Sequence, residues 1–182
     1  IGHSFGGSVA MRAALEFKNQ INTLVLLEPN PFFLFNKENQ PIEYLESRKF
    51  GQTIRLHKEK KDWEGFSKTF LSFWIGDHAW DSMSKKKKQL FLKVIPNIYH
   101  EAEAIFSEQM KIKDFLSIQE KILLISTKDT NLVSKGITKI FKKELPKTTQ
   151  VLLPKGGHMA PVTSPELVNP IIYDHLLNRF NS

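Results

Sequence analysis

A serine between two glycines stands near the start of the chain. Gly2, Ser4 and Gly6 form the pattern G-x-S-x-G, here GHSFG. A nucleophilic serine must hold its Oγ in the open, on a turn too sharp for ordinary side chains, and small residues two positions before and after it let a strand and the following helix approach closely. The helix would place the positive end of its dipole beneath the serine. The pattern therefore predicts a nucleophile for acyl transfer; the alternative is a glycine-rich turn that merely contains a serine.

Acyl transfer by a serine also needs a base and an acid that orients the base. His158 lies in a Gly-Gly-His-Met segment just after a short apolar stretch, and histidine accepts and returns a proton near neutral pH. Asp129 follows the apolar segment 121–126, where it could orient His158. Aspartate after a strand is also common in simple turns.

These residues, in the order Ser, Asp, His, resemble the α/β-hydrolase family. The GHSFG segment is similar to the family's nucleophile elbow, Asp129 to its acid loop after the seventh strand, and the Gly-His-Met segment to its histidine loop. The resemblance covers nearly the whole chain. It implies that Ser4 attacks a carbonyl carbon, that His158 acts as base and then as acid, and that Asp129 orients His158.

The resemblance leaves the identity of the acid open. Some members of the family carry the acid after the sixth strand, which makes Glu28 the alternative to Asp129; the pair Glu28-Pro29 also ends a strand simply because proline cannot donate to the ladder. We expect Asp129. The family pattern further implies that the backbone N–H of Phe5 supplies one oxyanion donor, and that His3 packs the elbow and is not a base.

Short apolar runs alternate with helical patterns on either side of a long middle segment. This predicts parallel strands covered by helices, an α/β fold that corresponds to the C-terminal portion of an α/β-hydrolase. The predicted strands are 21–27, 121–126 and 150–153, with a remnant at Ile1. The predicted helices are 7–17, 135–145 and one that begins with Ser164 as N-cap, bends near Pro170 and runs toward Phe180.

The middle segment, 32–116, is predicted to be helical and is aromatic and rich in lysine. This change in character divides the chain into the insertion 32–116 and two core regions, 1–31 and 117–182. In the resembled family a helical cap is inserted at this place. Helices are predicted to begin at Ile42, to span 63–74 with an aromatic face, and to span 86–95 and 97–109 on either side of Pro96. The aromatic residues are expected mainly to pack the cap against the core. In the resembled family the underside of the cap also forms the hydrophobic substrate wall, so some of them could serve both purposes.

Composition excludes several classes of protein. The 182 residues include no cysteine, so a disulfide framework is impossible. The net charge of +7 owes much to lysines such as the run 85–88, but no nucleic-acid motif accompanies them, and we interpret them as solvated helix faces. No apolar run approaches the ~20 residues of a membrane span. We expect no metal and no cofactor, a small-molecule acyl substrate as partner, and a cytoplasmic location.

The chain opens at Ile1, directly before the elbow. In the resembled family the nucleophile lies midway through the domain, so the front half of the domain, with the second oxyanion donor and any signal peptide, is expected to lie upstream. Residues 1–182 alone are therefore expected to be an inactive fragment.

The function that these residues predict is hydrolysis of a carboxylic ester or a related acyl bond by a Ser-His-Asp triad. The same triad serves acyltransferases and carbon–carbon hydrolases, and the sequence does not separate them. A non-catalytic binding protein with this fold, using its basic helical segment as a contact surface, is the alternative from another class.

Overall fold

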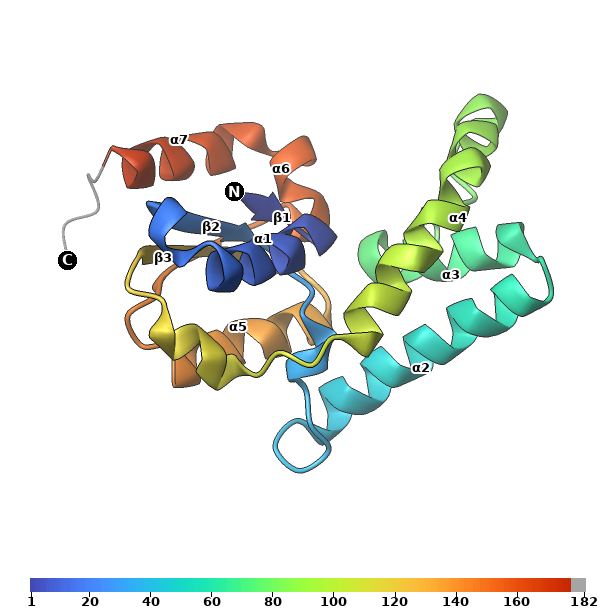
Figure 1. Ribbon diagram of the computed structural model, residues 1–182. Helices are drawn as coiled ribbons and strands as arrows, with labels where there is room; N and C mark the ends of the chain where they lie inside the picture. Colours follow the sequence, from blue (N-terminus) through green and yellow to red (C-terminus); the bar gives the residue numbers. More distant parts are fainter. Residues whose placement is uncertain (178–182) are drawn as a thin grey trace. The chain divides into compact units, whose positions relative to one another are not determined.

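A parallel sheet carries the residues singled out above. The computed structural model describes residues 1–177, apart from the side chain of Asn19. Its strands lie in the order β1-β2-β3-β4, all parallel (Figure 1). They are β1 (Gly2–His3), β2 (Thr23–Leu27), β3 (Lys121–Thr127) and β4 (Thr149–Leu153). Because parallel strands share one direction, the loops that follow them gather at the carboxyl edge of the sheet.

The chain divides into two compact units, 1–34 with 109–182 and 35–108. The first unit contains the sheet and these helices: α1 (Phe5–Glu16), α5 (Leu132–Glu144), α6 (Ala160–Thr163), α7 (Pro165–Leu176), and the 3₁₀ turns η1 (Lys18–Gln20), η2 (Phe32–Leu34), η3 (Ile112–Ser117) and η4 (Gly157–Met159). Residues 32–34 and 109–116, which lie within the predicted insertion 32–116, thus belong with the sheet.

Both faces of the sheet are buried, as its apolar runs predict. Val25 and Ile125 point to the face covered by α6 and α7, where Val168 completes an apolar cluster. Side chains alternate along a strand, so Leu26 and Leu124 point to the opposite face. Figure 1 shows α7 on one side of the sheet and α1 and α5 on the other. This covering on two sides explains why the strands read as continuous apolar runs and not as alternating ones.

The predicted strands and helices of this unit are confirmed, with shifts of a few residues at their ends. Ser164 is the N-cap residue of α7 and Pro165 its first residue, although the Ser164 side chain makes no capping hydrogen bond. Pro170 lies inside α7. Phe180, toward which this helix was expected to run, lies outside the described residues.

The second unit is a group of long helices, α2 (Pro41–Glu59), α3 (Trp63–Ile75) and α4 (Lys85–Ser107). Aromatic rings join α2 to α3: Phe50 stacks on Phe73 at 4.1 Å between ring centroids, and Trp74 meets the Phe73 ring edge-on at 4.8 Å. These aromatic residues therefore pack against one another within this unit, and their expected packing of the cap against the core stays a prediction.

The prediction that Pro96 separates two helices is wrong. Helix α4 continues through Pro96 from Lys85 to Ser107. A proline inside a helix removes one hydrogen bond and costs about 3 kcal/mol. Ile95, Tyr99 and Ile105 are nevertheless buried. The burial of such a face on both sides of Pro96 offsets the cost, since a buried Ile contributes ~1.5–3 kcal/mol by itself.

Among the described residues, no helix combines the length and the apolar character that a membrane span needs.

A buried histidine that no sequence motif singles out, His175, joins α7 to the sheet. His175 is buried, and its Nε2 lies 2.6 Å from Thr23 Oγ1. The Thr23 hydroxyl donates to the carbonyl of Lys121, so its oxygen accepts from the histidine ring. Burial, together with the charge of Lys121, lowers the pKa of His175 below 6.5. The folded state therefore keeps His175 neutral at pH values where the unfolded chain takes up a proton.

Acid should consequently weaken the fold through His175. Because the unfolded state binds the additional proton, the free energy of unfolding falls as the pH drops below about 6.5. In His175→Gln, which keeps an N–H donor, we expect a smaller fall in the urea midpoint between pH 7 and pH 5 than in the complete wild-type gene product. His100→Gln, at an exposed position on α4, is the control and should follow the wild type. An equal pH dependence in all three proteins would contradict this account.

Candidate active site

Ser4 lies on the turn between β1 and α1, as the G-x-S-x-G pattern predicts. Its backbone is strained, with φ 54° and ψ −123°, and it is the N-cap residue of α1. The Ser4 N–H donates to the carbonyl of Leu27 at 3.1 Å, which fixes the turn to the end of β2. Left-handed backbone at a residue other than glycine costs about 1–3 kcal/mol and is concentrated at functional sites.

Two glycines leave the space that this turn needs: Gly2, which the pattern marks, and Gly7, which it does not. A Cβ on Gly2 would overlap the carbonyl of Gly6, and one on Gly7 would lie 2.8 Å from the Cβ of Pro29. A Cβ on Gly6 would meet nothing within 4 Å. The close approach of strand and helix therefore depends on Gly2 and Gly7, and the expectation that Gly6 is needed for space is wrong for the described residues.

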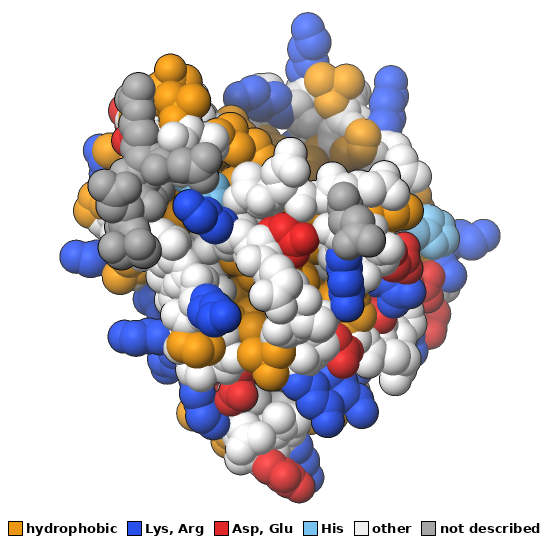
Figure 2. Space-filling view, turned by 60° about the vertical axis from the view of Figure 1, so that its left-hand side comes forward, with side chains coloured by type: hydrophobic (Ala, Val, Ile, Leu, Met, Phe, Trp, Pro, Cys, Tyr) orange, Lys and Arg blue, Asp and Glu red, His pale blue; other side chains and the backbone are white. Residues whose placement is uncertain are grey.

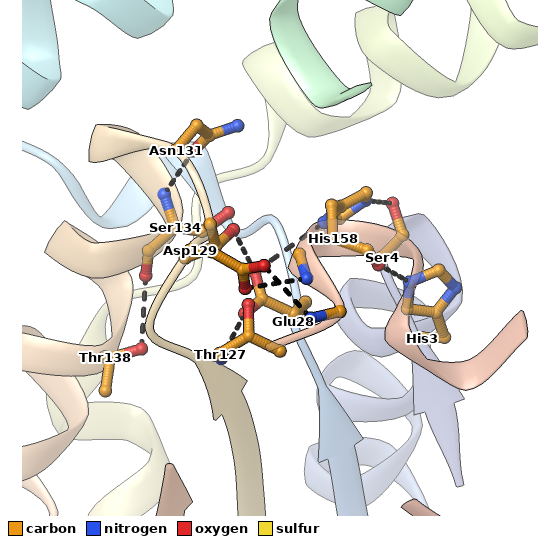
Figure 3. Close-up of polar contacts among 12 residues, drawn as sticks. His3, Ser4, Glu28, Thr127, Asp129, Asn131, Ser134, Thr138 and His158 are labelled. Atoms are coloured by element: carbon orange, nitrogen blue, oxygen red, sulfur yellow. Dashed lines mark hydrogen bonds and ion pairs between the residues drawn. The ribbon is translucent and has the colours of Figure 1, made fainter. Parts of the chain in front are cut away.

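His158 lies against Ser4. It belongs to η4, after β4, and its side chain is only 4% exposed. Its Nε2 lies 2.8 Å from Ser4 Oγ, a hydrogen-bond distance (Figure 3). The sequence thus identified two residues, 154 positions apart, that the fold brings into contact.

Glu28 is the carboxylate that faces the other side of the His158 ring. Glu28 Oε2 lies 3.7 Å from His158 Nδ1, and the Glu28 side chain is 2% exposed. This separation is longer than a hydrogen bond, and catalytic hydrogen bonds are often long before substrate binds. Like Ser4, Glu28 has a left-handed backbone, with φ 42°.

The Glu28 carboxylate is held from several directions. Oε1 accepts from the N–H of Thr127 at 2.8 Å and from its hydroxyl at 3.3 Å, and Oε2 accepts from the hydroxyl of Thr130 at 2.7 Å. Burial alone would raise the pKa of Glu28, but His158, Thr130 and Thr127 together hold it below its ordinary value. A carboxylate that stays ionised beside a histidine can stabilise a proton on that histidine.

Asp129 lies in the loop after β3 and contacts the backbone of the loop that carries His158. Its two oxygens accept from the backbone N–H groups of Gly157 at 2.9 Å and Gly156 at 3.1 Å (Figure 3). It is exposed, and although its slight burial acts the other way, these amides lower its pKa. Both glycines have positive φ. Asp129 therefore contacts the backbone that leads into His158, whereas Glu28 faces the ring.

Further polar residues take part that the sequence did not single out for these contacts. His3 Nε2 donates to the backbone carbonyl of His158 at 2.7 Å, and burial lowers the pKa of His3, which favours its neutral form. Thr127 and Thr130 flank Asp129 in the sequence, and nothing in that pattern indicates that they hold Glu28. Within residues 1–177, no group of three or more acidic or histidine side chains is arranged to hold a metal ion.

A parallel sheet with a strained serine between a strand and the next helix, and with acid and histidine loops at its carboxyl edge, defines an α/β hydrolase fold. The chain belongs to that family, because the family model described as "alpha/beta hydrolase fold" matches residues 1–165. The class expected from the sequence is thereby confirmed.

Individual relatives agree with this assignment. The chain is 26% identical to the hydrolase YugF of Bacillus subtilis over 187 residues, which cover 97% of this chain and 64% of the relative. It is 22% identical to the putative carbamate hydrolase RutD of Pantoea ananatis, covering 97% of this chain and 62% of the relative. The chain thus spans somewhat less than two thirds of the length of these curated relatives.

Solved structures share the fold. An α/β hydrolase from a Medee basin deep-sea metagenome library has a TM-score of 0.72 at 15% sequence identity. The likeness covers 94% of this chain and 62% of that structure.

Proposed function

We propose that the protein is a serine hydrolase that cleaves a carboxylic ester or a related acyl bond. One observation carries the proposal: Ser4 Oγ lies 2.8 Å from His158 Nε2, and a buried, ionised carboxylate faces the other nitrogen of the ring. Such a chain of nucleophile, base and acid is what acyl transfer by serine requires. The hydrolase names of the relatives agree with it, and the carbamate hydrolase among them acts on a substrate class that also contains an acyl carbonyl.

In the proposed mechanism, Ser4 attacks the carbonyl carbon while His158 Nε2 takes the hydroxyl proton. The same nitrogen then returns the proton to the leaving group, and water releases the acyl group by the reverse sequence. The N–H of Phe5, the first residue of α1, is free of an intrahelical acceptor by its position and is the proposed oxyanion donor.

The geometry favours a division of work between the two candidate acids. Glu28 faces His158 Nδ1, so we propose that Glu28 stabilises the histidine cation. Asp129 is then a positioning residue, since it binds the amides of Gly156 and Gly157 and fixes the loop that carries His158. The preference for Asp129 as acid rested on its position in the sequence; the distances in the structure support Glu28.

A fluorophosphonate probe tests the proposal directly. Such a probe reacts with a serine whose hydroxyl proton is removed by a neighbouring base, and fluoride leaves as the Oγ–P bond forms. We expect the complete gene product to be labelled at Ser4, and labelling to be lost in Ser4→Ala. Ser8→Ala is the matched control, because the Ser8 hydroxyl lies one turn along α1 and donates to Asn30 Oδ1 at 3.0 Å.

Absence of labelling under conditions in which a known serine hydrolase reacts would contradict the proposal. It would favour a non-catalytic binding protein with this fold.

A further inference from the structure

A cavity lies at the opposite edge of the sheet from Ser4. It has a volume of about 430 Å³ and is built around the start of β3 and the turn that leads into β4. Ligand pockets in proteins commonly have volumes of ~300–1,000 Å³. The six steps from Lys121 to Thr127 along β3 span about 20 Å, which separates the cavity from the groups around Glu28. The cavity is therefore distinct from the proposed active site.

The cavity has an apolar lining and a charged rim. Phe115, Ile122 and Leu145 are buried and contribute to its walls. Lys121 and Lys147 line it as well, together with the single acid Glu120. Figure 2, in which the left-hand side of Figure 1 comes forward, shows Lys and Arg side chains scattered among apolar surface on this face. A cavity with these properties suits a molecule with an apolar body and a negative head.

Thr148 adds a hydrogen-bonding group that is left unsatisfied. Thr148 lines the cavity and is 9% exposed as a residue, while its Oγ1 is itself buried and, among the described residues, has no hydrogen-bond partner. The Thr148 N–H is already used, since it donates to the carbonyl of Leu145 at 3.0 Å. Buried hydroxyl groups are nearly always paired, so an unpaired one beside a cavity is a specific signal for a missing partner.

We propose that this cavity binds an amphiphilic carboxylate, such as a medium-chain fatty acid. Once its side chain turns toward the cavity, the Thr148 hydroxyl donates to one carboxylate oxygen. Lys147 supplies opposite charge at the rim, and the apolar chain lies against Phe115 and Leu145. The excess of lysine over glutamate at the rim favours a carboxylate over an ammonium head. Binding at this site does not depend on the catalytic activity proposed for Ser4.

Decanoate is the probe, and the protein is the complete gene product. We expect isothermal titration to detect decanoate binding, decanol to bind more weakly, and decylamine to show no binding. A diazirine-bearing decanoate should crosslink, by mass spectrometry of the digested protein, within residues 115–122 or 145–148. Crosslinks confined to other peptides, or no decanoate binding at millimolar concentration, would overturn the proposal.

Thr148→Val keeps the size of the side chain and removes the hydroxyl. We expect it to weaken decanoate binding about tenfold, and Lys147→Gln to weaken it less. In Thr138→Val, the control, binding should be unchanged, because the Thr138 hydroxyl donates to the carbonyl of Ser134 within α5. Decanoate should raise the melting temperature of the wild type more than that of Thr148→Val.

The unliganded proteins separate a ligand role from a structural one. If Thr148 Oγ1 awaits a ligand, Thr148→Val without decanoate should melt no lower than the wild type, because no internal hydrogen bond is lost. A clear drop in its melting temperature, or unchanged decanoate affinity in this variant, would show that the hydroxyl serves the fold and would overturn the proposal.

Discussion

Ser4→Ala should lower kcat for an activated ester such as p-nitrophenyl acetate on the order of a millionfold in the complete gene product. This is the scale on which a serine hydrolase loses rate when its nucleophile or its base is removed. His158→Ala should cost a similar factor, because Nε2 lies 2.8 Å from Ser4 Oγ and the nucleophile is ineffective without that base. The double variant should be no slower than either single variant, since residues that act as one unit are not additive.

Ser8→Ala provides the reference for this series and should keep the wild-type rate. A multiplicative loss in the double variant would indicate that Ser4 and His158 act independently, which contradicts a shared proton transfer. Residual turnover in Ser4→Ala close to that of the wild type would remove Ser4 as the nucleophile.

Glu28→Gln should lower kcat by about 10,000-fold, the effect of neutralising the acid in a serine triad. The amide oxygen can still accept from Thr127, and the amide NH2 can donate to the Thr130 hydroxyl, so we expect the fold to be kept. It no longer stabilises a positive charge on His158, and it can favour the ring tautomer that does not accept the Ser4 proton. Asp129→Asn should cost less than about 100-fold, since it disturbs the position of the histidine loop and leaves the ring partner in place.

Thermal melts of both variants check that each remains folded, because Glu28 is buried and Asp129 is exposed. The two carboxylates exchange roles if Asp129→Asn causes the larger loss. That outcome would return the acid to the position expected from the sequence, and it would leave Glu28 as a buried structural group.

Much of this site could be predicted because each of its short motifs can be recognised from neighbouring residues, and the motifs follow one another in the order expected for the fold. The G-x-S-x-G pattern marks Ser4, and a glycine-flanked histidine after the last strand marks His158. The choice between Glu28 and Asp129 could not be made in this way. Both follow strands, and the difference lies in where two side chains point across neighbouring loops. Glu28 reaches the ring from a left-handed backbone, which its sequence neighbours do not indicate.

The remaining errors also concern effects that are not local. Pro96 normally ends a helix, and its retention inside α4 depends on the burial of side chains on both sides of it. Gly6 fits the spacing rule, yet a Cβ atom there would meet nothing. The Cβ atom that the pattern does not exclude is the one at Gly7, which would clash with Pro29 in the loop after β2. The unpaired hydroxyl of Thr148 depends on the enclosure of one turn by other segments, for which short sequence patterns carry no signal.

At Ser4 and Glu28, the residue that the proposed activity needs is not the residue that the left-handed backbone favours. At each position a glycine would adopt the same conformation without the steric cost of a Cβ atom. The backbone conformation at these two positions thus favours glycine, which has no side chain to take part in a reaction. At Ser4, selection for stability alone would favour glycine over the proposed nucleophile. At Glu28, loss of the carboxylate would leave the buried donors of Thr127 and Thr130 unpaired, which opposes the gain in backbone freedom. A thermostabilising library for this protein should therefore hold both codons fixed. A screen of glycine variants for stability and turnover could therefore locate functional groups. Positions at which glycine raises the free energy of unfolding but abolishes turnover would be positions kept for function and not for stability.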